Sequence, residues 1–116
     1  MTTAIEGFYS VYVTGKEGQG FAIFILNARR VIGADAAGFL FDGQYDEDED
    51  GTSVSLSVKA PANAPRVQGG VTGPEGEETH LNFRLPLNFT SHPFIRIETP
   101  RGPMNVKLVK LRSMSD

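Results

Sequence analysis

Five consecutive carboxylates form the most distinctive chemical group in this sequence. They lie between two segments with the alternating pattern of strands. Adjacent carboxylates repel one another and lose hydration when buried, so we expect them at an exposed turn. Three interpretations are open: a solvated turn that limits aggregation at a sheet edge, a docking element for a basic protein surface, and a calcium-binding loop. The run consists of Asp46, Glu47, Asp48, Glu49 and Asp50.

The calcium interpretation rests on part of the EF-hand pattern. Aspartates alternate along the run, and Gly51 occupies the sixth position, as in an EF-hand loop. The twelfth position is Ser57, where that motif needs a bidentate Glu, and the flanking segments look like strands instead of helices. The pattern therefore matches calcium binding only in part, and we expect no metal site.

The docking interpretation needs only that the carboxylates stay accessible. An exposed acidic cluster attracts Arg and Lys side chains of a partner over a long range and fixes the register of the contact by charge complementarity. The residues that we expect to bind a partner are Glu47, Asp48, Glu49 and Asp50.

The other titratable residues offer no arrangement for catalysis. The chain has no cysteine, which excludes disulfides, thiolate nucleophiles and Cys-based zinc sites. His80 and His92 are the two histidines, and neither has a close acidic neighbour that would suggest a metal triad. We therefore expect strand or turn residues at both positions, no catalytic residues, no cofactor and no enzyme activity.

The charge is distributed unevenly along the chain. The net charge is −3, with −6 in residues 1–58 and +3 in residues 59–116. An acidic total argues against a dedicated nucleic-acid binder, whose domain is usually basic. A basic protein is the more plausible partner.

Glycines and prolines interrupt the sequence so often that strands are the expected element throughout. Val54, Leu56 and Val58 alternate with polar residues and give the clearest strand pattern. Short strands at this spacing predict one all-β domain over residues 1–116, an antiparallel barrel or sandwich. The expected strands cover residues 5–14, 20–27, 31–33, 38–45, 52–60, 80–85, 94–98 and 104–111.

Two segments are less regular. Residues 61–78 contain three prolines and four glycines and predict a long, mobile loop. In residues 104–111 the adjacent Leu108 and Val109 break the strand alternation, and Met104, Leu108 and Leu111 also fit a helical stripe. A bulged strand and a short helix are both open there.

No segment indicates a membrane. The longest nearly apolar stretch, residues 21–26, is too short to cross a bilayer, and residues 1–6 lack a basic region followed by an apolar run. We expect a soluble, cytoplasmic protein that does not associate with membranes.

Residues 7–58 resemble the GrlR family, negative regulators of type III secretion gene expression. The resemblance rests on the order of short motifs: Gly7-x-Tyr9-x-Val11 in the first expected strand, the glycines and apolar run of the second, Ile32-Gly33-Ala34-Asp35, and Gly43 followed by Glu47-Asp48-Glu49-Asp50. No matching motif follows Ala60.

The resemblance implies a lipocalin-like barrel of eight strands that forms a homodimer. It also implies that the Glu-Asp-Glu-Asp loop binds a DNA-binding transcriptional activator and holds it off its promoter. The resulting hypothesis is a non-catalytic negative regulator of transcription that acts through protein–protein interaction.

The alternative is a barrel that binds a lipid-like hydrophobic ligand in its interior. This alternative predicts an enclosed cavity of at least roughly 300 Å³. A chain of this length could instead fill the interior with aromatic side chains. The candidates for filling it are Phe8, Phe24, Phe39, Phe83 and Phe94.

Overall fold

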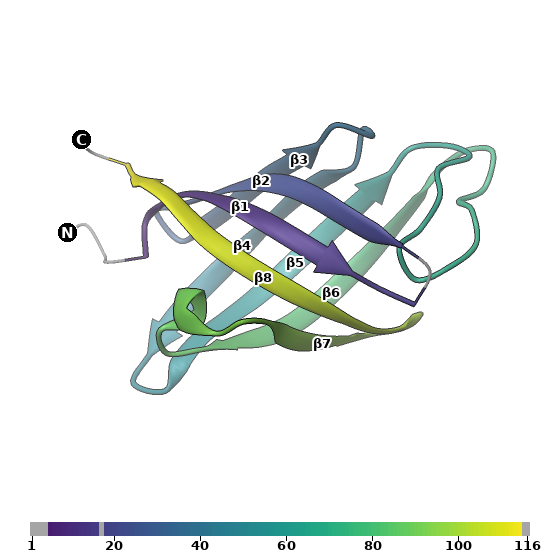
Figure 1. Ribbon diagram of the computed structural model, residues 1–116. Coiled ribbons are helices and arrows are strands. Elements are labelled where there is room, and N and C mark those ends of the chain that lie inside the picture. The colour runs from purple at the N-terminus through teal and green to yellow at the C-terminus, as the bar shows by residue number, and fades with distance from the viewer. Residues whose placement is uncertain (1–4, 17, 115–116) are drawn as a thin grey trace.

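A computed structural model describes residues 5–16 and 18–114. Over these residues the chain forms eight strands and one short 3-10 helix, η1 (Phe89–Ser91). The strands are β1 (Gly7–Thr14), β2 (Gln19–Asn27), β3 (Arg30–Asp35), β4 (Leu40–Asp48), β5 (Gly51–Ala60), β6 (Glu77–Pro86), β7 (Ile95–Thr99) and β8 (Gly102–Ser113). All ladders are antiparallel, and the order in the sheet is β6-β5-β4-β3-β2-β1-β8-β7 (Figure 1).

Pairing of β1 with β8 nearly closes this sheet into a barrel. The ladder runs from Gly7 opposite Ser113 to Thr14 opposite Asn105. The two ends of the sheet, β6 and β7, lie beside each other, and within the described part of the chain no ladder joins them. The predicted all-β barrel is confirmed.

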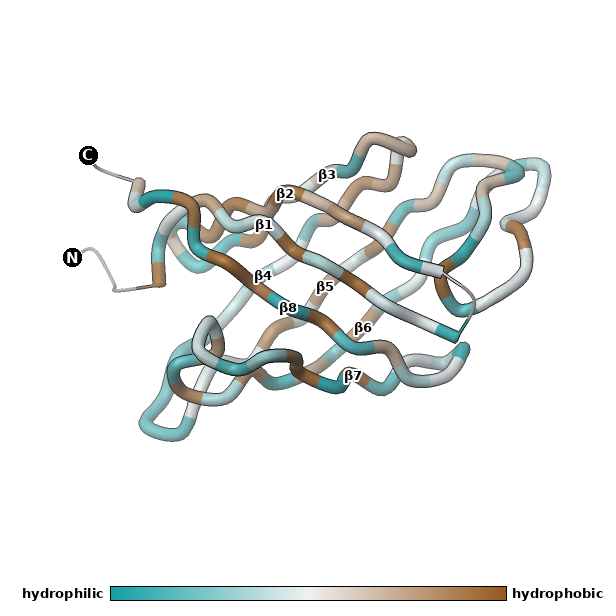
Figure 2. The backbone as a smooth tube through the Cα atoms, in the orientation of Figure 1, coloured by the Kyte–Doolittle hydropathy of each residue, from teal (hydrophilic) through white to brown (hydrophobic). Residues whose placement is uncertain are grey.

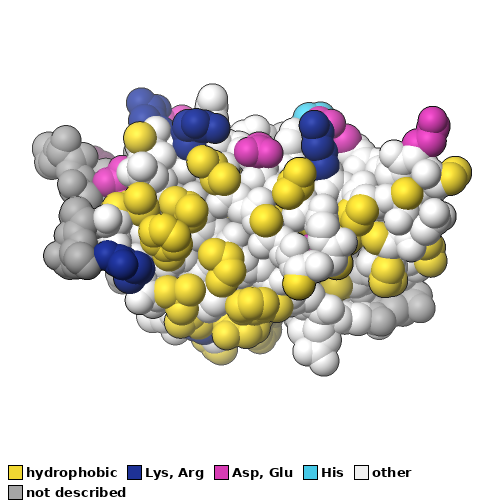
Figure 3. Space-filling model, turned by 90° about the horizontal axis from the view of Figure 1, so that it is seen from above, with side chains coloured by type: hydrophobic (Ala, Val, Ile, Leu, Met, Phe, Trp, Pro, Cys, Tyr) yellow, Lys and Arg dark blue, Asp and Glu magenta, His cyan; other side chains and the backbone are white. Residues whose placement is uncertain are grey.

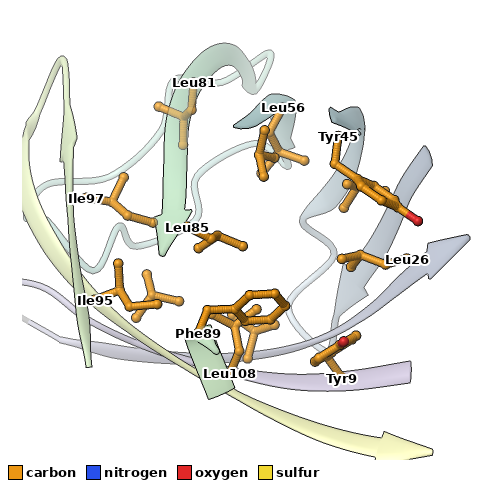
Figure 4. Packing of buried hydrophobic residues seen from close by; sticks show 14 residues of the cluster. Tyr9, Leu26, Tyr45, Leu56, Leu81, Leu85, Phe89, Ile95, Ile97 and Leu108 are labelled. Carbon is orange, nitrogen blue, oxygen red and sulfur yellow. The ribbon is translucent and has the colours of Figure 1, made fainter. Parts of the chain in front are cut away.

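The alternation of side chains explains why these segments form a barrel. In β5, Val54 and Leu56 are buried while Ser53 and Ser55 are exposed, and Figure 2 shows the same change of hydropathy along neighbouring strands. Each large apolar side chain that leaves water contributes about 1.5–3 kcal/mol. The buried cluster, drawn in Figure 4, consists of Tyr9, Val11, Leu26, Val31, Tyr45, Val54, Leu56, Leu81, Leu85, Phe89, Ile95, Ile97, Val106 and Leu108.

Aromatic side chains fill one end of the barrel. The η1 turn follows β6, and the ring centroids of its Phe89 and of Tyr9 lie 5.8 Å apart (Figure 4). The Tyr9 hydroxyl donates a 2.6 Å hydrogen bond to the Ile5 carbonyl. Burial, with smaller effects of Tyr45 and of the Glu47 carboxylate, raises the pKa of Tyr9 to about 12. The hydroxyl therefore remains a donor at neutral pH. The contact between the Tyr9 and Phe89 rings closes this end of the barrel.

The ambiguous C-terminal segment is a strand. The register between β1 and β8 shifts between Phe8, which pairs with Arg112, and Tyr9, which pairs with Lys110. Leu111 is therefore the extra residue of a β-bulge. Leu108 is buried and Val109 is exposed, so these two adjacent apolar residues lie on opposite faces of a regular part of β8.

The interior is less filled by phenylalanine than the sequence suggested. Phe24, Phe39 and Phe83 line an internal cavity. Phe94 is exposed, and Phe8 alternates with the buried Gly7 and Tyr9, so it lies on the outer face of β1. The expectation that all five rings enter the interior is wrong for these two, because the side of a strand on which a residue lies depends on its parity.

The long segment between β5 and β6 folds back on itself. Its residues Pro65 and Val71 form an isolated antiparallel bridge. The buried Thr72 hydroxyl accepts a hydrogen bond from the Ala64 N–H at 2.9 Å and donates one to the Pro61 carbonyl at 2.5 Å. Residues 61–76 cover the end of the barrel away from η1 (Figure 1).

Among the described residues, no helix has the length and hydropathy needed to cross a bilayer.

The aromatic end of the barrel predicts a large effect of one substitution. Phe89 is 4% exposed, so Phe89→Ala leaves a cavity and should lower the free energy of unfolding by about 3–5 kcal/mol. Urea denaturation followed by circular dichroism measures this change. Leu87→Ala is the control, because Leu87 is 56% exposed in the same connection and should change stability by less than about 0.5 kcal/mol. Equal effects of the two variants would contradict this packing.

Candidate functional site

The acidic run forms the tip of the β4–β5 hairpin. The run does not sit wholly in a turn, because β4 continues through Asp48, which pairs with Gly51. Glu49 and Asp50 make the two-residue turn, and the Asp50 N–H donates a 2.8 Å hydrogen bond to Asp48 Oδ1. Gly51 has φ +153°, and a Cβ there would clash with the Leu85 carbonyl oxygen. The predicted exposure of the run is confirmed, since all five of its residues are exposed.

Two arginines from other strands contact this hairpin. Arg29, between β2 and β3, forms an ion pair with Asp46. Arg84 in β6 forms an ion pair with Asp48 and donates a 2.8 Å hydrogen bond to Ser53 Oγ. The Arg84 hydrogen bond, followed by that from the Asp50 N–H, holds the pKa of Asp48 below its usual value. These arginines orient two carboxylates of the hairpin.

The remaining carboxylates of the run are available. In the described structure, Glu47, Glu49 and Asp50 form no ion pair. Five negative charges and two arginines leave the hairpin with a net charge of −3. The site can therefore attract cations even after its internal ion pairs have formed.

Sequence reasoning identified the acidic residues but missed both arginines. Arg84 reaches the hairpin because it lies opposite Ser53 in the β5–β6 ladder, and Arg29 does so because it lies in the turn before β3. The register of β5 against β6 spans the long 61–76 segment. No local pattern in the sequence gives that register.

A second candidate site lies inside the barrel. The cavity has a volume of about 520 Å³ and is lined mainly by apolar side chains of the strands. Neither Tyr9 nor Phe89 belongs to its lining, whereas Pro65, Val67 and Thr72 of the 61–76 segment do. The cavity therefore extends from the end covered by residues 61–76 as far as Leu26 and Leu85, and Tyr9 and Phe89 lie outside it.

Three charged side chains meet at this covered end. The Arg66 guanidinium donates to both carboxylate oxygens of Glu77, at 3.0 and 2.5 Å. Arg101 Nη2 lies 3.1 Å from Glu77 Oε2. All three residues line the cavity. One carboxylate faces two guanidinium groups, which leaves this cluster with a net charge of +1.

The histidines lie outside both sites. His80 Nδ1 is 2.9 Å from Ser57 Oγ, and its Nε2 is 3.4 Å from Glu78, so it has one acidic neighbour. His92 follows η1, and its carbonyl accepts a hydrogen bond from Lys107. In residues 5–16 and 18–114, no three His, Cys, Asp or Glu side chains are grouped as metal ligands.

Comparisons with protein-family models, with curated proteins and with solved structures find no match.

The Arg66–Glu77–Arg101 cluster predicts a dependence of stability on pH. Hydrogen bonds from Arg66, and then the charge of Arg101, hold the pKa of Glu77 below its ordinary value of 4.5. A carboxyl group with a lowered pKa stabilises the folded state above its unfolded pKa and loses that contribution as pH falls through the folded value. Wild type should therefore be more stable than Glu77→Gln at neutral pH, and the difference should shrink below pH 4.5.

Urea denaturation of both proteins across this pH range measures the difference. Glu75→Gln is the control, because Glu75 is an exposed carboxylate of the same segment without an ion pair to any described residue. A difference for Glu77→Gln that stays constant with pH would contradict the cluster.

Proposed function

We propose that this protein is a non-catalytic negative regulator whose acidic hairpin binds a basic transcriptional activator and keeps it from DNA. The observation that carries the proposal is the net charge of −3 on an exposed hairpin tip whose Glu47, Glu49 and Asp50 carboxylates have no internal ion pair. The resemblance of residues 7–58 to the GrlR family, made on the same acidic run, supports it.

The proposed mechanism is competition for cations. DNA-binding surfaces carry Arg and Lys side chains that contact phosphates. The three available carboxylates offer these cations an alternative set of anions, and the charge attracts them over about 8 Å at physiological ionic strength. An activator bound to the hairpin then has fewer cations free for DNA.

The predicted binding residues have two different roles, because only some of them form ion pairs within the hairpin. Asp48 is held by Arg84 and by the Asp50 N–H, so it fixes the shape of the turn. Glu47, Glu49 and Asp50 supply the charges that contact the partner. The hairpin that carries these residues lies at the end of the barrel where β4 meets β5 (Figure 1).

The combined variant Glu47→Gln, Glu49→Gln and Asp50→Asn tests this function. It should fold normally, since exposed charges contribute little to stability, and weaken binding of the activator roughly tenfold at low salt, with a smaller salt dependence. Calorimetric titration with a basic DNA-binding activator measures the affinity.

The matched control removes three exposed carboxylates elsewhere, in the variant Asp42→Asn, Glu75→Gln and Glu78→Gln. This control changes the net charge equally but should bind the activator nearly as well as wild type. Equal loss in both variants would mean that overall charge, not the hairpin, governs binding.

We also propose a homodimer that forms through the outer face of the sheet. Apolar side chains lie exposed across neighbouring strands β8, β1, β2 and β3, and Figure 3 shows hydrophobic side chains spread over this side of the molecule. The face consists of Tyr12, Phe21, Ile23, Ile32, Val109 and Leu111. β2, at its centre, has no charged residue. A second copy offers the same apolar side chains, so a two-fold contact covers both faces at once.

A charge at the centre of this face should prevent the dimer. Ile23→Asp places a carboxylate in the proposed contact and should shift the mass measured by light scattering from dimer to monomer. Leu87→Asp, at a more exposed apolar position between β6 and η1, should leave the mass unchanged. A wild-type protein that is monomeric at tens of micromolar would exclude the dimer.

A further inference from the structure

The internal cavity and the charged cluster at its covered end together describe a binding site. The volume of about 520 Å³ lies within the range of small-molecule sites, roughly 300–1,000 Å³. Its walls are apolar side chains of facing strands, including Phe24 and Phe41, whose ring centroids lie 4.9 Å apart. An apolar space of this size, left unfilled by the side chains, favours an apolar occupant.

The shape of the cavity sets the direction of such an occupant. One end of the barrel is closed by Phe89 and Tyr9, which do not line the cavity. At the other end the lining includes Arg66, Glu77 and Arg101. A ligand with an apolar chain and one polar group therefore places its chain toward the barrel centre and its polar group beside the arginines.

The charges at this end select the sign of the polar group. Glu77 is 22% exposed and is shared by Arg66 at 16% and Arg101 at 45%. Arg66 forms a two-bond pair with Glu77, whereas Arg101 contacts it through Nη2. Since Arg101 makes no other charged contact among the described residues, its remaining N–H groups can donate to a ligand.

Asp35 is the fourth charged residue of the lining, and among the described residues it forms no ion pair with Arg66 or Arg101. Asp35 Oδ1 accepts hydrogen bonds from the Ala37 and Phe39 N–H groups, at 2.9 and 3.0 Å, in the β3–β4 turn. These two donors stabilise its charge locally. The excess guanidinium charge next to Glu77 remains available for an anion.

We propose that the cavity binds a single-chain fatty acid. Its alkyl chain lies among the apolar walls, and its carboxylate accepts hydrogen bonds from Arg101. A monoanion matches the net charge of +1 of the cluster, whereas the second charge of a phosphate monoester finds no further cation there. A planar carboxylate also suits the forked N–H groups of Arg. This site is independent of the acidic hairpin and of the regulator function proposed for it.

The test compares three ligands of one chain length. Calorimetric titration of the full chain with dodecanoate, dodecanol and dodecylamine, each below its micellar concentration, separates apolar burial from charge. Dodecanoate should bind at least about tenfold more tightly than dodecanol, and dodecylamine most weakly. Equal affinities for acid and alcohol, or no binding of any of the three, would overturn the proposal.

Two substitutions locate the site. Arg101→Gln should reduce the affinity for dodecanoate to that for dodecanol, while Arg96→Gln, at an arginine in an exposed ion pair with Glu98, should not change it. Val58→Phe places a ring into the cavity from β5 and should abolish binding of both ligands. Dodecanoate binding that survives Val58→Phe in a folded protein would place the ligand on the surface and refute the assignment.

Discussion

The pairing of the first strand with the last is the constraint on which the remaining structure depends. Six strands in a row, from β1 to β6, form a simple antiparallel meander, and β7 with β8 form a separate hairpin. Only the β1–β8 ladder joins these two parts in the described chain. It accommodates a close approach at Gly7, where a Cβ would clash with the Arg112 carbonyl oxygen. Because the sheet curves into a barrel, each strand turns one face toward the interior, and its apolar side chains pack there.

Closure also gives the barrel two different ends. At one end, η1 inserts Phe89 against Tyr9, and the β4–β5 hairpin extends its acidic tip. At the other end the 61–76 segment covers a cavity beside Arg66 and Arg101. The same strands serve both ends, since β5 contributes Gly51 to the hairpin and Val58 to the cavity. An acidic hairpin at one end and an arginine cluster at the other thus belong to one barrel, because alternate turns lie at opposite ends of a barrel.

The sequence determines the strands more fully than it determines the sites. Alternation identified β5 correctly because Val54, Leu56 and Val58 follow a local period of two. The exposure of the acidic run followed from the repulsion of adjacent charges, which is also local. The ion pair of Arg84 with Asp48 depends on the register across 61–76, and the cavity depends on how far opposite walls lie apart. These are distances between residues far apart in the chain, and composition and periodicity contain no information on them.

The two proposed sites can act separately. The molecule measures 43 Å along its longest axis, and the acidic hairpin and the arginine cluster lie at its opposite ends (Figure 1). Charges separated by several Debye lengths, each of about 8 Å, are screened from one another in physiological salt. A carboxylate bound beside Arg101 therefore does not repel a partner from Glu49 by charge alone.

Conformational coupling between the two sites would need a strand with two arrangements, each preferred by one ligand. The strands between the two sheet edges are instead held by ladders on both sides, as in β4, which pairs with β5 along its length and with β3 from Leu40 to Gln44. Loss of one binding activity by mutation should accordingly leave the other intact.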